Sequence, residues 1–166
     1  MKEIIFENKS WNTLQQLSEQ GYPKEVCGLL LGIFQNGSAV VQKIEVLENV
    51  LDGQHSERLN QLMKMGVVTL PKERALKGGG TEFFIDPMEH SSKILLAQKE
   101  GLDQVGVFHS HPDHPATPSS TDASQPMMAG WSSVIVKVDR GNFVEARSWY
   151  RENEENSFQE ENIVIK

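Results

Sequence analysis

The stretch VGVFHSHPDHPATPSSTD, from Val105 to Asp122, decides how this chain folds. Its apolar beginning predicts a strand at 104–109, and Pro112 ends the extended run because proline cannot donate to a sheet ladder. Side chains two positions apart on a strand share one face at about 6.6 Å. We therefore expect His109 and His111 to project together, on the face of Val105 and Val107.

A carboxylate can join these two imidazoles. The nine residues 113–121 are long enough to bring Asp122 back to the histidines, since extended chain reaches about 3.3 Å per residue. Two histidines and one carboxylate are typical of catalytic zinc, which keeps a fourth position open for water. An HxH pair alone has little specificity, and Ser119 with Asp122 equally predicts a capping box at the start of a short helix. Capping and ligation are compatible.

A second informative stretch, EVCGLLLG, runs from Glu25 to Gly32. The apolar run 26–34 is too short for a good helix and predicts a strand buried on both faces. Glu25 stands at the mouth of that strand, where it is either a general base or an exposed acid paired with a neighbour such as Lys24. Cys27 shares its face, and we interpret this thiol as a small hydrophobic residue rather than a zinc ligand.

The remaining pattern predicts one mixed α/β domain over residues 1–166, with an insertion at about 51–80 that has a structured part near Leu62 to Leu70. The expected helices lie at 10–20, capped by Ser10, and at 87–100 around Ile94, Leu95 and Leu96. The expected strands lie at 38–48, after an Asn36-Gly37 turn, and at 81–85, 134–138, 143–150 and 162–165.

Composition excludes several classes of protein. The chain has 166 residues, of which 38% are hydrophobic and 23% charged, as in soluble globular domains. It has no apolar run of membrane-spanning length and no signal peptide, so we expect a cytoplasmic protein. One cysteine excludes disulfides and zinc sites built from paired thiolates. A net charge of −7 argues against nucleic acid as a partner. The oligomeric state is not indicated.

The two stretches together resemble the JAMM/MPN-domain (Mov34/PAD-1, JAB) zinc metallopeptidase family. That pattern has a glutamate before a GLLxG-like strand, then HxHP, then a serine and an aspartate, and no position departs from it here. The resemblance implies a cytidine-deaminase-like mixed β-sheet sandwiched by helices. It also implies that His109, His111 and Asp122 ligate one zinc ion, that Glu25 transfers protons, and that Ser119 stabilises the oxyanion.

The resemblance further implies the substrate. It would be a peptide or isopeptide bond that follows the C-terminal Gly-Gly tail of a ubiquitin-like or sulfur-carrier protein, bound with help from an inserted flap at 51–80. Three alternatives remain: a zinc nucleobase deaminase, which needs cysteines that this chain lacks; a RadC-like DNA-repair protein, which the acidic charge and Glu25 oppose; and a metal-free MPN scaffold.

Overall fold

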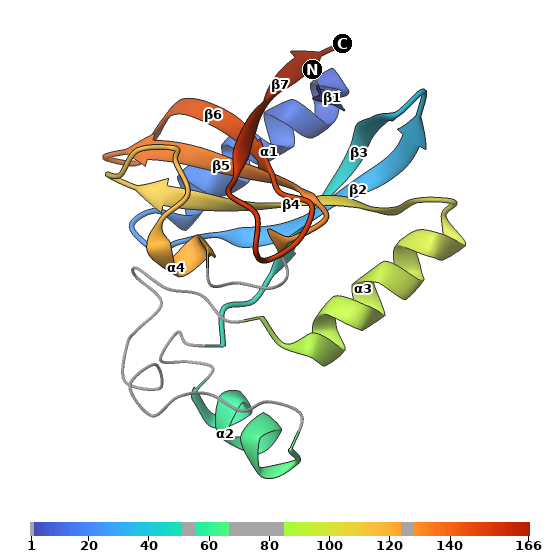
Figure 1. Cartoon of the computed structure of the whole chain (residues 1–166). Coiled ribbons are helices and arrows are strands. Elements are labelled where there is room, and N and C mark those ends of the chain that lie inside the picture. The colour runs from blue at the N-terminus through green and yellow to red at the C-terminus, as the bar shows by residue number, and fades with distance from the viewer. Residues whose placement is uncertain (1, 51–55, 67–84, 124–127) are drawn as a thin grey trace.

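A computed structural model gives the fold of the chain and describes residues 2–50, 56–66, 85–123 and 128–166. Figure 1 shows a twisted sheet with helices on both sides. The helices are α1 (Asn8–Gly21), α2 (Ser56–Lys64), α3 (Pro87–Lys99) and α4 (Ser120–Ala123). The strands are β1 (Glu3–Phe6), β2 (Cys27–Gln35), β3 (Ser38–Leu47), β4 (Asp103–Pro112), β5 (Ser132–Asp139), β6 (Asn142–Tyr150) and β7 (Gln159–Ile165).

The strands form one mixed sheet in the order β1-β3-β2-β4-β5-β6-β7, which closes because β1 also pairs with β7. β4 is parallel to β5, and β1 is parallel to both of its neighbours, whereas the other pairs are antiparallel. The two ends of the chain therefore lie side by side (Figure 1). The sequence pattern did not reveal β1, a strand of four residues, and closure depends on it.

The hairpin of β2 and β3 confirms the predicted buried strand and its turn. Asn36 and Gly37 both have positive φ, 52° and 82°, as a two-residue hairpin turn requires. The first six residues of β2 are buried, and the strand becomes exposed from Ile33 onward. Gly32 is needed because a Cβ there would overlap the backbone carbonyl of Val40 on β3.

Helix α1 covers one face of the sheet. Trp11, Leu14 and Leu17 pack on a core that includes Phe6 of β1, as the helical spacing predicted. The helix begins earlier than expected, at Asn8, so the prediction that Ser10 caps it was wrong. Ser10 lies within the first turn, and its hydroxyl donates to backbone carbonyls at two sites.

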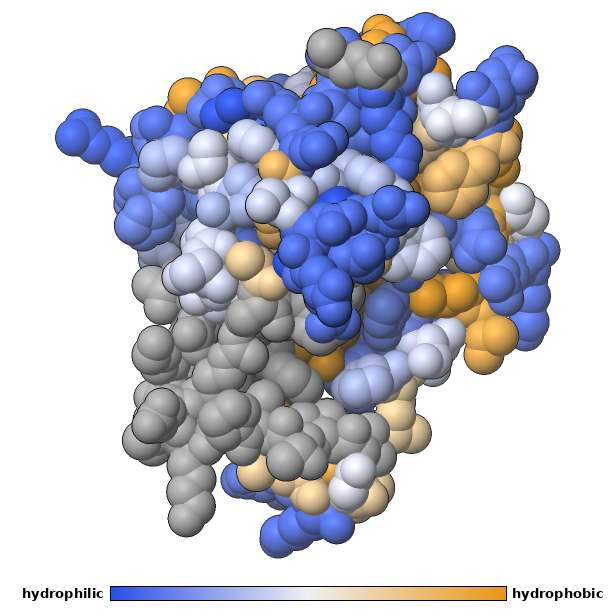
Figure 2. Space-filling view, in the orientation of Figure 1, coloured by the Kyte–Doolittle hydropathy of each residue, from blue (hydrophilic) through white to orange (hydrophobic). Residues whose placement is uncertain are grey.

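Helix α3 covers the other face, with Ile94 and Ala97 packed on a second core. Asp86 caps it by accepting a hydrogen bond from Met88 N at 2.9 Å. Leu95 and Leu96, which lie within the predicted helix, are 61% and 60% exposed. Apolar residues accordingly gather at the right of Figure 2, the side on which α3 lies. No described helix combines the length and the apolar character that crossing a membrane requires.

The region 51–80 is described only in part. Helix α2 occupies 56–64, so the structured segment begins earlier than the predicted Leu62 to Leu70. Residues 51–55 and 67–84 lie outside the described part, and with them most of the predicted flap and of the strand at 81–85. Ile85 itself forms an isolated bridge with Asn49, which joins the two ends of the insertion.

Candidate metal centre

Strand β4 places both histidines on one face. His109 lies opposite Cys27 of β2 and beside Ile135 of β5, so its backbone is fixed from both sides. Val107 belongs to the core on this face, as predicted, but Val105 belongs to the core on the opposite face. The reason is an irregularity in the pairing of β2 with β4, where the register shifts between Leu30 and Leu31. The predicted face of Val105, Val107, His109 and His111 therefore begins only at Val107.

Asp122 reaches the histidines from α4. The backbone N–H and the hydroxyl of Ser119 donate to Asp122 Oδ2 at 2.7 and 2.8 Å, while Asp122 N donates back to Ser119 Oγ at 3.1 Å. These reciprocal bonds are the capping box that the sequence predicted. They also fix the carboxylate, so the cap holds Asp122 in place for the pair of imidazoles.

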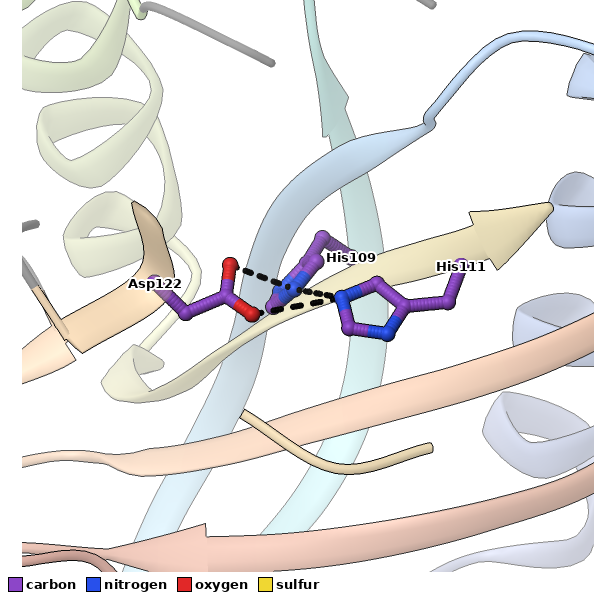
Figure 3. Close-up of side chains that lie close together, drawn as sticks. All are labelled: His109, His111 and Asp122. Atoms are coloured by element: carbon purple, nitrogen blue, oxygen red, sulfur yellow. Dashed lines mark hydrogen bonds and ion pairs between the residues drawn. The ribbon is translucent and has the colours of Figure 1, made fainter. Parts of the chain in front are cut away.

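The three side chains converge on one point (Figure 3). His109 Nε2 and His111 Nε2 lie 2.9 Å apart. Asp122 Oδ1 is 3.0 Å from His109 Nε2, and its Oδ2 is 3.2 Å from His111 Nε2. This is the one group of histidine and acidic side chains with metal-binding geometry among the described residues. The predicted ligand triad is therefore assembled.

The donor set fits zinc. Tetrahedral zinc with ligands at about 2.0–2.2 Å places its donor atoms roughly 3.3 Å apart. The observed separations of 2.9–3.2 Å need to open by only a few tenths of an ångström. All three residues are buried, with exposed fractions of 1%, 6% and 2%. Because they supply three donors, a bound ion would keep a position for water or substrate.

A backbone carbonyl fixes the tautomer of His111. Its Nδ1 lies 2.7 Å from Pro115 O. A carbonyl oxygen can only accept, so Nδ1 carries a hydrogen in both the neutral and the charged ring. Neutral His111 therefore presents the Nε2 lone pair to the centre of the triad, whereas the protonated ring donates from Nε2 to Asp122. Such outer bonds orient metal-binding histidines and raise their basicity. Sequence reasoning missed this contact, because a backbone oxygen leaves no side-chain signal in the pattern.

Electrostatics couples the triad. Burial works to raise the pKa of Asp122, but the charge of His109 and the hydrogen bonds from both histidines outweigh it and hold that pKa well below its usual range. For His111, burial works to lower the pKa, yet the hydrogen bond to Asp122 and the Pro115 carbonyl raise it overall. The ionised aspartate thus favours positive charge at this point, whether proton or metal cation.

An open cavity of about 290 Å³ adjoins the triad, and its lining includes Glu25, His111 and Ser119. Glu25 is half-buried just before β2, and its charge contributes to the raised pKa of His111. The structure therefore brings every predicted site residue to one place. Their chemical roles, however, stay predictions.

Three other residues near the centre have simpler surroundings. Burial first, and then the charge of Glu25, raise the pKa of the Cys27 thiol, so that it stays protonated. Asp113 is a structural residue, since it accepts from Tyr22 Oη at 2.7 Å and from Arg140 N at 2.9 Å. His114 is exposed and lines the cavity.

The family assignment agrees with this geometry. A family described as prokaryotic homologs of the JAB domain matches residues 8–152. The chain belongs to this family. The match covers Glu25, β2, β4 and α4, and so includes His109, His111 and Asp122. It confirms the resemblance drawn from the two sequence stretches.

Two curated relatives are named desampylase. The protein from Pyrococcus furiosus is 33% identical over 86 residues, which make up 51% of this chain and 57% of that protein. The protein from Haloferax volcanii is 34% identical over 55 residues, or 33% of this chain and 40% of that protein. The matched stretches thus span about half the length of these relatives.

Two solution structures share the JAB-domain fold seen here. Protein DSY2949 from Desulfitobacterium hafniense superposes with a TM-score of 0.70 at 23% identity, over 98% of this chain and 92% of that one. A protein from Salinibacter ruber superposes with a TM-score of 0.62 at 29% identity, over 100% of this chain and 92% of that one. The likeness extends over the whole chain and supports the fold.

Proposed function

We propose that this JAB-domain protein is a zinc-dependent peptidase that hydrolyses a peptide or isopeptide bond. The observation that carries the proposal is the convergence of His109 Nε2, His111 Nε2 and the Asp122 carboxylate within 3.2 Å, beside a cavity that Glu25 also lines. The name desampylase, carried by two relatives, supports hydrolytic activity.

His109, His111 and Asp122 would hold the ion. Zinc supplies Lewis-acid chemistry, in that it polarises a carbonyl and lowers the pKa of bound water to roughly 7. The protein supplies the rest. The buried carboxylate of Asp122 offsets part of the cation's charge, and the Pro115 carbonyl keeps the His111 lone pair directed at it.

Glu25 would move the proton. Its carboxylate takes a proton from the attacking water as the new C–O bond forms, and delivers it to the amine nitrogen as the C–N bond breaks. That transfer matters because an amine is a poor leaving group until it is protonated, and a positioned base contributes about 10² to 10⁴ in rate. The half-buried position of Glu25 on the cavity suits this role.

Ser119 would stabilise the oxyanion. Its hydroxyl donates to Asp122 Oδ2 in this structure, so it would have to exchange that bond for one to the substrate oxygen. The backbone N–H of Ser119 also donates to Oδ2 and would keep the aspartate fixed during the exchange. A donor that meets the developing charge is worth about 2.7–4 kcal/mol.

The proposed substrate is the Gly-Gly tail of a ubiquitin-like or sulfur-carrier protein. An extended tail without side chains can bring its last carbonyl to a buried centre. The lining of the cavity beside the triad includes small or rigid residues such as Thr117 and Pro118. The relatives named desampylase support this substrate class.

The test measures zinc content and cleavage together. Purified protein should hold one zinc ion and cleave ubiquitin-like or sulfur-carrier proteins extended past Gly-Gly, and a chelator should stop cleavage. His109→Ala or Asp122→Ala should lose both zinc and activity, because two remaining ligands hold zinc poorly. His90→Ala is the matched control, since His90 bonds to Gln104 away from the triad. Full activity in zinc-free protein would overturn the proposal.

A further inference from the structure

The segment between β4 and α4, residues 113–119, carries the carbonyl that orients His111, and a tryptophan on another strand holds it. Trp149 of β6 donates from its indole Nε1 to Ala116 O at 2.9 Å. Ala116 is fully buried. A buried carbonyl without a partner costs about 1–3 kcal/mol, so this bond fixes the backbone at Ala116.

The contact lies one peptide away from the bond that fixes His111. Pro115 O accepts from His111 Nδ1, and Ala116 O, the next carbonyl along the chain, accepts from Trp149. Two successive carbonyls are thus held by two ring N–H groups from different strands. A shift of the Pro115–Ala116 backbone would change both hydrogen bonds together, and with them the direction of the His111 Nε2 lone pair.

Trp149 is itself held in place. The guanidinium of Arg147 lies over its ring, 4.7 Å from the ring centroid. Arg147 forms two hydrogen bonds to Glu160 of β7, from Nε and Nη2, each 2.7 Å long. Fork-to-fork pairing of this kind fixes the guanidinium plane. The indole is therefore covered on one face by a side chain that is fixed in turn.

The start of the segment has a separate anchor. Asp113 N donates to Val138 O at 2.9 Å, and the Asp113 carboxylate accepts from Tyr22 and Arg140. These contacts hold the first residue of the segment but leave the two carbonyls at Pro115 and Ala116 to other partners. The second of these carbonyls, Ala116 O, accepts the hydrogen bond from Trp149.

We propose that Trp149 is a positioning residue of the metal centre. Its indole N–H sets the Pro115–Ala116 backbone so that the Pro115 carbonyl keeps His111 in its metal-binding tautomer and orientation. The inference rests on the proposed zinc site. It assigns a role in that site to a residue of β6, a strand that contributes none of the five predicted site residues.

The test is Trp149→Phe, which keeps an aromatic ring under Arg147 and removes the N–H donor. Zinc affinity, measured by competition with a chromogenic chelator, should fall by up to about 10-fold. This is the lower end of the loss for groups that bond a metal ligand directly, because Trp149 acts on His111 through one intervening peptide. The Nδ1 proton of His111 should also move upfield in nitrogen-edited NMR of the zinc-loaded protein. In the zinc-free Trp149→Phe protein at pH 9, the imidazole nitrogen shifts of His111 should report a mixture of tautomers.

Trp11→Phe is the control, because it makes the same change in the core under α1 on the other face of the sheet. It should leave zinc affinity and the His111 signals unchanged even if the melting temperature falls. Arg147→Gln is a second variant, which loosens the cover of Trp149 and should weaken zinc binding by up to about fivefold.

Outcomes separate the two proposals. Wild-type protein that binds no zinc would contradict the proposed function, whereas the NMR measurement on zinc-free protein still tests the role of Trp149. Unchanged zinc affinity and unchanged His111 nitrogen shifts in Trp149→Phe would overturn the positioning role and leave the zinc peptidase proposal standing.

Discussion

Cys27 and His109 are directly opposite each other in the pairing of β2 with β4. The thiol is 2% exposed, and its Sγ lies 3.7 Å from Leu47 O, the contact of a weak donor. It is not a member of the ligand group among the described residues. A thiol on the same face as the triad is therefore packed as a hydrophobic neighbour of the centre.

Cys27 should resist alkylation in the folded protein. Burial raises its pKa, so the thiolate that attacks iodoacetamide is scarce at pH 8, and the side chain is inaccessible as well. We expect less than one-tenth modification in native protein under conditions that fully modify the guanidinium-unfolded chain, measured by mass spectrometry. Cys27→Ala should still bind zinc. Rapid labelling of the native protein would show that the pairing of β2 with β4 opens.

Glu25→Gln should separate chemistry from metal binding. The amide keeps the size of the side chain but cannot take a proton, so zinc content should stay at the wild-type level while kcat falls about 10² to 10⁴-fold. The measurements are metal analysis and initial rates on a Gly-Gly-extended substrate. Normal rates in this variant would mean that another group is the base.

Several parts of the fold follow from local pattern, and others depend on contacts that pattern does not encode. The alternation in β4 predicted that His109 and His111 share a face, and the Asn-Gly turn predicted the β2–β3 hairpin. Val105 was assigned to the wrong face because an irregularity in strand pairing reverses the alternation, and nothing in the apolar run marks it. Closure through β1 and β7 joins the two ends of the chain, so a local sequence pattern cannot predict it.

The site shows the same division. Spacing and residue type predicted the convergence of His109, His111 and Asp122 and the capping box, because both depend on side chains within the stretch from Val105 to Asp122. The bond from His111 to the Pro115 carbonyl and the bond from Trp149 to Ala116 were not predictable, since backbone oxygens are present at every position. Only the three-dimensional arrangement distinguishes the carbonyl oxygens of Pro115 and Ala116 from the others.

Ser119→Ala should separate the role of the hydroxyl in the capping box from its role in catalysis. If Ser119 meets the oxyanion, kcat should fall about 10² to 10³-fold, the loss seen when one such donor is removed. Zinc affinity should fall far less, because the Ser119 backbone N–H still holds Asp122 at 2.7 Å. An unchanged kcat would restrict Ser119 to its cap.

Asp86 should make part of the stability dependent on pH. Its carboxylate caps α3 and accepts from Arg58 Nε at 2.8 Å, which ties α2 to α3. Burial works to raise the pKa of Asp86, but the Arg58 bond and the Met88 N–H outweigh it and lower the pKa. A lowered folded-state pKa stabilises the protein above the unfolded value of about 3.9, and this contribution disappears as pH falls through the folded value.

Two substitutions at Asp86 should separate charge from capping. Asp86→Asn keeps a capping oxygen and removes the ion pair, so it should lower the free energy of unfolding by up to about 1 kcal/mol at pH 7. Asp86→Ala should cost about 0.5–2 kcal/mol more through loss of the cap. Urea unfolding at pH 7 and at pH 2.5 would measure both, and the asparagine variant should approach the wild type at the lower pH. A difference that persists undiminished at pH 2.5 would show that the charge of Asp86 is not the cause, because the wild-type carboxyl loses that charge as the pH falls through its folded-state pKa.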